Sequence, residues 1–430
     1  LTPGGSSFPE SVKTALSVAG AERTPEQKAE LEKYFLEHGD AATKSAAAAV
    51  EKEEKTLQSF REQLPIVMVM KERNEPREAF ILVRGQYDRR GDKVGRGTPA
   101  ALPAMPVEYP QNRLGFAQWL VARNNPLTAR VWANRTWERF FGTGLVKTTE
   151  NLGSQSEWPS HPELLDWLAA EFMEPTQLQS VAGQTPHAWD IKALDKLIVM
   201  SETYQQSAKV SSAADPENRL LARGPRFRLS AEMIRDQALA VSGLLVERSG
   251  GPSVRPFMPD GVWDETSRYG DLRGYKPDDG EGRHRRSLYT IWKRTAAPPS
   301  MLLFDAPSRE ICTVKRSRTN TPLQALALLN EPTYLEAARS LGQRIRMEGG
   351  STNEEQLAWG FRVVTGRKPS TQELDVLVQG MKADAEQLRS TAPAEAVKTE
   401  TAKTEENQIE VLYTLTANIL LNLDETVTRE

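Results

Sequence analysis

The chain has 430 residues, of which 39% are hydrophobic and 26% are charged, and its net charge is −3. This composition is typical of folded globular proteins, and the length predicts two or three domains. The near-neutral charge argues against nucleic acid as a partner, since phosphate binding requires a basic face. The sequence contains no apolar run of about 18 residues, so it predicts no membrane span.

The N-terminal residues, 1–64, predict a helical hairpin or linker. Thr24-Pro25-Glu26-Gln27 is a capping box with proline at the first helical position. Gly39 separates two expected helices, the second of which carries the charged run at residues 51–55. The opening Leu1-Thr2-Pro3-Gly4-Gly5 has no initiator methionine and is not a signal peptide. It fits either a tag-free start or a fragment of a longer protein, and we favour the fragment.

The next segment, residues 65–111, predicts a small β-containing connector. Residues 66–70 (IVMVM) and 79–83 (AFILV) are typical of strands. Glu75-Pro76 separates these two runs, and a loop rich in glycine and arginine follows at residues 85–97.

Residues 112–430 predict a mainly helical domain, with helices expected at 113–121, 126–141, 162–172, 189–203, 230–246 and through most of 321–430. Capping boxes at Ser160–Glu163, Thr321–Gln324 and Ser370–Glu373 mark helix starts. A loop rich in Gly, Pro and Asp at 250–286 precedes an alternating, strand-like run at 287–293, and we expect a flexible insertion at 390–407. The predicted fold class is therefore mainly α: a multi-helix body with a small β element near residues 65–110 and a long loop-rich insertion near 250–295.

Several sequence phrases are distinctive. They are 113–120 (RLGFAQWL), 125–131 (NPLTARV), 134–137 (NRTW), 141–146 (FGTGLV), 159–168 (PSHPELLDWL), 285–289 (RRSLY), 304–307 (FDAP) and 318–326 (RTNTPLQAL). Together they resemble the C-terminal domain of unknown function of planctomycete-type cytochrome c-associated proteins, over roughly residues 65–430. In that family a cytochrome c-like domain commonly precedes this module, and lectin-like domains are sometimes inserted. The resemblance implies an exported protein in a redox or glycan context, and it supplies no catalytic residues.

Arginines flank the long loop and form the candidate site. The predicted substrate-binding residues are Arg285, Arg286, Arg294, Asp305, Arg309, Arg316, Arg318, Asn320 and Gln324. Arginine binds carboxylate or sulfate through two parallel hydrogen bonds, and the Asp, Asn and Gln side chains can orient it. One interpretation is a pocket for an acidic ligand, such as an anionic sugar or a haem propionate. The other is an internal arginine–carboxylate network that ties loops to the helical core.

Other chemistry is weakly indicated. Cys312 is the only cysteine, and with no CxxCH motif the chain cannot attach a c-type haem in the usual way. Neighbouring cations could activate this thiol, although a buried, inert cysteine is the favoured interpretation. The four histidines have no zinc-like spacing. The long loop could bind calcium through its carboxylate oxygens, or it is simply a solvated acidic loop; its acidic residues are Asp260, Asp264, Glu265, Asp271, Asp278, Asp279 and Glu281.

These observations and the resemblance together give two functional hypotheses. The first is a haem-free interaction or scaffold module of a multidomain cell-envelope redox protein linked to glycan processing. Its expected partners are a cytochrome c-bearing domain or chain and a polysaccharide, and its expected location is periplasmic or cell-surface. The alternative is a glycan-acting enzyme or carbohydrate-binding module, with a site between the 250–286 loop and the arginine-rich segment 285–318. No cofactor other than calcium is predicted.

Overall fold

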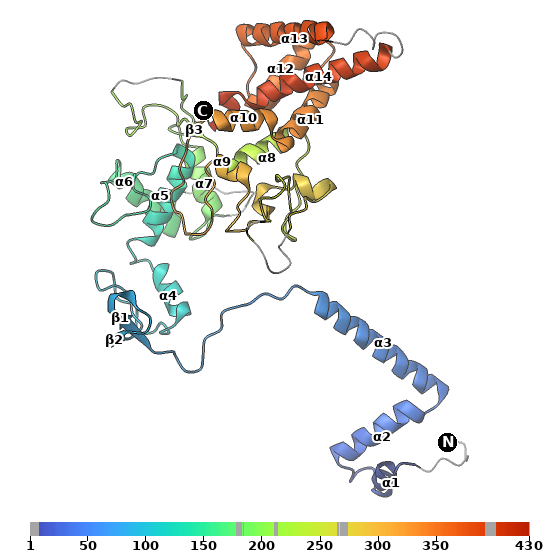
Figure 1. Cartoon of the computed structure of the whole chain (residues 1–430). Helices are drawn as coiled ribbons and strands as arrows, with labels where there is room; N and C mark the ends of the chain where they lie inside the picture. Colours follow the sequence, from blue (N-terminus) through green and yellow to red (C-terminus); the bar gives the residue numbers. More distant parts are fainter. Residues whose placement is uncertain are drawn as a thin grey trace. The chain divides into compact units, whose positions relative to one another are not determined.

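The structure is a computed structural model that describes residues 8–177, 183, 185–209, 214–264, 266, 274–391 and 401–429. The chain divides into two compact units, residues 1–96 and 97–430, which are described separately. The finer division at residues 64 and 111 stays a prediction. Over the described residues, helices α1 to α15 and two small two-stranded sheets confirm the mainly α fold class (Figure 1). None of the described helices is long and apolar enough to cross a membrane.

The N-terminal unit begins with three helices, α1 (Glu10–Ser17), α2 (Pro25–His38) and α3 (Ala41–Gln63). Helix α2 starts at the predicted capping box, where the Thr24 side chain accepts from the Gln27 backbone N–H and the Gln27 side chain accepts in return from that of Thr24. Helix α3 starts at Asp40, whose carboxylate accepts from the Thr43 backbone N–H at 2.7 Å. The two helices predicted before residue 64 are thus present, and α1 precedes them.

The β element of this unit is a hairpin. Strand β1 (Ala79–Leu82) pairs antiparallel with β2 (Arg90–Val94), so that Ala79 lies opposite Val94. The strand predicted at residues 66–70 is wrong: this run forms no strand, and its side chains are 75–101% exposed. Between Leu82 and Arg90 the short 3₁₀ turn η1 (Val83–Gly85) reverses the chain, so β1 takes the following segment as its partner.

In the C-terminal unit, α4 (Arg113–Leu120) precedes a first helical layer of α5 (Thr128–Phe141), α6 (Pro162–Met173) and α7 (Ile191–Val199). The last three of these helices share a core that includes Ala133, Trp137, Leu165, Phe172 and Leu194. The buried positions on α5 recur at helical spacing, which leaves its opposite face polar.

A second layer forms around α8 (Ala231–Val241), α9 (Pro299–Leu303), α10 (Pro322–Asn330), α11 (Pro332–Glu348), α12 (Asn353–Thr365), α13 (Thr371–Thr391), α14 (Thr401–Leu421) and α15 (Asp424–Val427). Helices α11 and α14 lie side by side (Figure 1). Their close approach depends on Gly342, where a Cβ atom would lie 2.8 Å from the Tyr413 backbone. Leu341, Ile345 and Leu420 complete this core.

The loop-rich insertion also departs from the prediction. Its described residues include the 3₁₀ turns η2 (Gly280–His284) and η3 (Ser287–Tyr289), so the strand expected at residues 287–293 is wrong. The backbone N–H of Ser287 donates to the Asp236 carboxylate at 2.7 Å, and that of Thr290 donates back to Ser287 at 3.1 Å. These two N–H groups are therefore not available for the hydrogen bonds of a β-sheet. The only sheet-like pairing of Thr290 among the described residues is an isolated bridge with Val254. Of the expected insertion at 390–407, residues 392–400 lie outside the described residues and 401–407 belong to α14.

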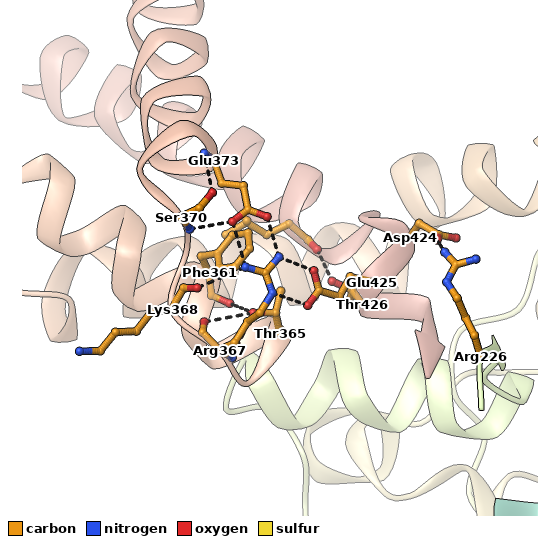
Figure 2. Close-up of polar contacts among 11 residues, drawn as sticks. Arg226, Phe361, Thr365, Arg367, Lys368, Ser370, Glu373, Asp424, Glu425 and Thr426 are labelled. Atoms are coloured by element: carbon orange, nitrogen blue, oxygen red, sulfur yellow. Dashed lines mark hydrogen bonds and ion pairs between the residues drawn. The ribbon is translucent and has the colours of Figure 1, made fainter. Parts of the chain in front are cut away.

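A clamp near the C-terminus fixes the end of the chain. Arg367 donates to both oxygens of Glu373 at 2.9 and 2.6 Å and to both oxygens of Glu425 at 2.6 Å (Figure 2). The hydrogen bonds from Arg367 hold the pKa of Glu373 far below its ordinary value. Glu425 lies in α15, directly before strand β4 (Thr428–Arg429), which pairs antiparallel with β3 (Phe227–Arg228). The clamp thereby helps to position Arg228.

Candidate functional site

A pocket of about 500 Å³ lies where the two helical layers of the C-terminal unit meet, and we call it the interlayer pocket. The first layer contributes the polar face of α5. The second layer contributes β3, the first turn of α8, the residues after α9 and one side chain of α10. The exposed segment Val314–Arg318, here called the strap, completes the wall.

The lining of the interlayer pocket is rich in positive charge. Its six cationic side chains are Arg135, Arg139, Arg228, Lys315, Arg316 and Arg318, and its three carboxylates are Glu138, Glu232 and Asp305. Arg316 donates to both oxygens of Glu232 at 3.0 and 2.7 Å, and Arg139 pairs with Asp195 at 2.6 Å. Burial is the largest single influence on Glu232 and opposes its ionisation. The hydrogen bonds and positive charge of Arg316, with hydrogen bonds at the start of α8, together outweigh burial, so the pKa of Glu232 lies below its ordinary value.

Three further cations are held by neutral groups. Arg318 donates to the Gly142 carbonyl at 2.8 Å and lies over the Phe227 ring at 4.4 Å. Arg228 donates to Asn320 Oδ1 at 3.1 Å, while its Nε is buried without a hydrogen-bond partner. Lys315 donates to the Lys147 carbonyl at 3.1 Å. A neutral partner positions a cation without cancelling its charge, so these groups leave the pocket electropositive.

Burial lowers the pKa of both Arg228 and Arg318. Arginine normally titrates so far above neutrality that both side chains remain protonated. The fourth cation without an ion-pair partner among the described residues is Arg135, which is exposed on α5. The pocket is therefore suited to carboxylate, sulfate or phosphate groups.

The base of the strap is fixed by two predicted site residues. The Asp305 carboxylate accepts from the backbone N–H and the hydroxyl of Thr319, at 2.7 and 2.8 Å. The fully buried Gln324 donates to the same hydroxyl at 3.1 Å and to the Leu303 carbonyl at 2.9 Å. Gln324 is also the return partner of the capping box that starts α10 at Thr321. Both side chains thus set where the strap ends.

The structure brings four predicted residues together, because Asp305, Arg316, Arg318 and Gln324 all line the interlayer pocket. Asn320 adjoins it through Arg228. No described residue of the 250–286 segment lines this pocket.

The remaining four predicted residues lie elsewhere. Arg285 is fully buried and donates to the carbonyls of three loop residues, Arg248, Gly250 and Pro252. Arg286 is exposed, 3.8 Å from an Asp236 oxygen. Arg309 lies over the Trp292 ring at 4.3 Å. Arg294 is exposed with no partner among the described residues. Arg285 thus fits the interpretation that internal arginines tie loops to the helical core. Its partners are backbone carbonyls, whereas carboxylates were expected.

Arg135, Glu138 and Arg139 were not predicted as site residues. Their i, i+3, i+4 spacing places them on one face of α5, opposite the buried Ala133 and Trp137. That spacing was the available signal, but it marks any solvated helix face equally well.

The other candidates gain no support from the described residues. Cys312 is exposed, so the expectation of a buried cysteine is wrong. Asp278 accepts from the Arg255 backbone N–H at 2.8 Å, and no group of three or more His, Cys, Asp or Glu side chains able to hold a metal occurs among the described residues. Glu265 and Asp271 of the acidic loop, and Tyr269, lie outside them, and calcium binding stays a prediction.

Neither a curated protein nor a solved structure matches this chain. The sequence model of one family, described as PSD1, protein of unknown function (DUF1553), matches residues 112–381. The matched range includes every residue that lines the interlayer pocket. The chain therefore belongs to the PSD1 family of proteins of unknown function (DUF1553).

Proposed function

We propose that this chain is a haem-free binding module whose interlayer pocket holds an anionic ligand, with an acidic sugar as the favoured class. The observation that carries the proposal is the set of cations fixed by neutral partners: Arg228 on Asn320 Oδ1, Arg318 on the Gly142 carbonyl and Lys315 on the Lys147 carbonyl. Phe227, Met233 and Phe304 add apolar surface to the same pocket. Apolar lining with a few convergent polar groups is typical of small-ligand sites.

The pKa and the hydrogen bonds of the pocket carboxylates favour ligand binding over glycoside hydrolysis. A glycosidase acid needs a carboxyl group with a raised pKa beside a second carboxylate. In the interlayer pocket, Arg316 lowers the pKa of Glu232 and holds both of its oxygens. Asp305 is already engaged by Thr319. These two groups are arranged as structural anchors.

The resemblance noted from the sequence supports a wider setting for this module. We propose an exported, periplasmic or cell-surface location and a cytochrome c-bearing domain or chain as partner, with the module contributing polysaccharide recognition. Co-purification from the native cell-envelope fraction tests the partner: a cytochrome-bearing chain should be recovered with this one. Recovery of this chain alone, free and monomeric, would contradict that part of the proposal.

Isothermal titration with galacturonate, glucose 6-sulfate and glucose tests the ligand class. The two anionic sugars should bind and the neutral sugar should bind at least about tenfold more weakly, a difference of about 1.4 kcal/mol. Arg318→Gln should weaken the anionic sugars selectively, because it removes a charge held only by a carbonyl and a ring. Equal binding of glucose and galacturonate would show that charge does not drive recognition.

A further inference from the structure

A second pocket, of about 310 Å³, adjoins the first, and we call it the side pocket. It is lined by the turn after α5, by Ser160 and by the irregular segment that leads into β3. Phe227 and Arg318 line both pockets, so the two cavities share part of their wall. Together they fall within the volume range of small-ligand sites, about 300–1,000 Å³.

The side pocket repeats the charge pattern of the interlayer pocket. Arg219 donates to the carbonyls of Gly144 and Leu145, both at 3.0 Å. Arg223 donates to the carbonyls of Asp215 and Pro216, at 2.9 and 2.7 Å. Both guanidinium groups are thus positioned by neutral oxygens that leave their charge uncompensated.

The only carboxylate that lines the side pocket among the described residues is Glu217. It is 65% exposed and accepts from Lys147 at 3.0 Å. Arg226, which also lines the pocket, pairs with Asp424 (Figure 2). The two arginines held by carbonyls therefore dominate the charge of this pocket.

The shared wall is compact and carries charge itself. The Arg318 guanidinium lies 4.4 Å from the centre of the Phe227 ring, and Arg429 approaches the same ring at 5.8 Å. Gly142 permits this packing: its φ is +77°, and a Cβ atom there would lie 2.7 Å from the Phe227 ring and 3.2 Å from the Arg318 guanidinium. A cation at the boundary can contact a ligand that extends from one pocket into the other.

We propose that the two pockets are adjoining subsites of one site, and that its ligand is an anionic oligosaccharide with acidic groups on successive sugar units. Arg228 faces the first unit, Arg219 and Arg223 face the next, and Arg318 lies between them. This inference rests on the proposed anion binding by the interlayer pocket. The shared chemistry is a repeating anion, whether uronate or sulfate.

Titration of the wild-type protein with monomers and tetramers tests the proposal. One arm uses galacturonate and tetragalacturonate, and the other uses galactose 6-sulfate and a tetramer of sulfated galactose. In at least one arm the tetramer should bind at least about tenfold more tightly than its monomer. Equal affinities in both arms would overturn the two-subsite proposal and leave the proposed function standing. Failure of every anionic sugar to bind would overturn both.

Two variants locate the gain in affinity. Arg223→Gln should remove most of the gain for the tetramer and leave the monomer unchanged. Glu217→Gln should tighten the tetramer about threefold without effect on the monomer, because it removes an exposed negative charge that repels an anionic sugar unit in the side pocket. Arg294→Gln, at an exposed arginine outside both pockets, is the matched control. Unchanged tetramer affinity in folded Arg223→Gln and Glu217→Gln proteins would refute a subsite in the side pocket.

Discussion

Replacing Arg285 with Met tests whether this arginine supports the fold, in contrast to the arginines that line the interlayer pocket. The guanidinium of Arg285 is fully buried, donates to the carbonyls of Arg248, Gly250 and Pro252 at 2.8, 2.5 and 3.1 Å, and stacks on the Tyr289 ring at 3.8 Å. Methionine keeps much of the side-chain volume and removes the charge and all three hydrogen bonds. The loop at residues 248–252 should then detach from the helical body.

The expected loss is about 2–3 kcal/mol of unfolding free energy. A hydrogen bond from a charged donor contributes roughly 1.5–3 kcal/mol. Two effects reduce the sum: Arg248 and Gly250 are exposed, so their carbonyls regain water, and the buried Nε of Arg285 already lacks a partner. Removing the buried cation also relieves its desolvation.

Urea unfolding of the wild type, Arg285→Met and Arg294→Met measures this difference. The Arg294 variant should stay within about 0.5 kcal/mol of the wild type, because that side chain is exposed and has no partner among the described residues. Equal stability of the two variants would refute the assignment of Arg285 to the fold.

Three further predictions concern other parts of the chain. Gly142→Ala should cost about 1–3 kcal/mol in thermal or urea unfolding, since it places a Cβ atom at positive φ against Phe227; a neutral result would contradict the described wall. Arg367→Met should cost about 2 kcal/mol at pH 7 after allowance for solvent screening. Because the folded-state pKa of Glu373 is lowered from 4.5, this difference should be complete above that value and shrink as the pH falls below it; a constant difference from pH 7 to pH 3 would refute the role of Glu373. Thermolysin should cleave within residues 66–70, whose side chains are 75–101% exposed, and leave a C-terminal fragment with its own melting transition. Loss of that transition on cleavage would show that the two units do not fold separately.

The helix starts at Thr24 and Thr321 were predictable because capping is local, whereas the box predicted at Ser160 is wrong: α6 begins after His161, which forms no side-chain cap hydrogen bond. The boxes at Thr24 and Thr321 contain within four residues the groups that satisfy the first backbone N–H donors, and both start helices in the structure. The strands at 66–70 and 287–293 were predicted wrongly because a strand needs a pairing partner, and the residue pattern of one run does not show whether a partner is present. In the second run, Asp236 takes a donor that a ladder would have used.

The candidate site could be predicted only in part, since sequence identifies arginines but not what faces them. Arg285 and Arg316 lie in the same cationic stretch, yet one is buried among carbonyls and the other lines a pocket with Glu232. Arg228 is not among the predicted site residues, and its place in the pocket wall depends on β3 pairing with β4 some 200 residues later. Such roles follow from tertiary contacts alone.

The most direct test of the account compares Arg228→Gln with Arg294→Gln in titrations with galacturonate and glucose 6-sulfate at low and moderate salt. Arg228→Gln should weaken the binding of at least one anionic sugar at least about tenfold, Arg294→Gln should leave it unchanged, and added salt should weaken wild-type binding. Equal affinities of the two variants, with both folded, would contradict the claim that the interlayer pocket binds an anion.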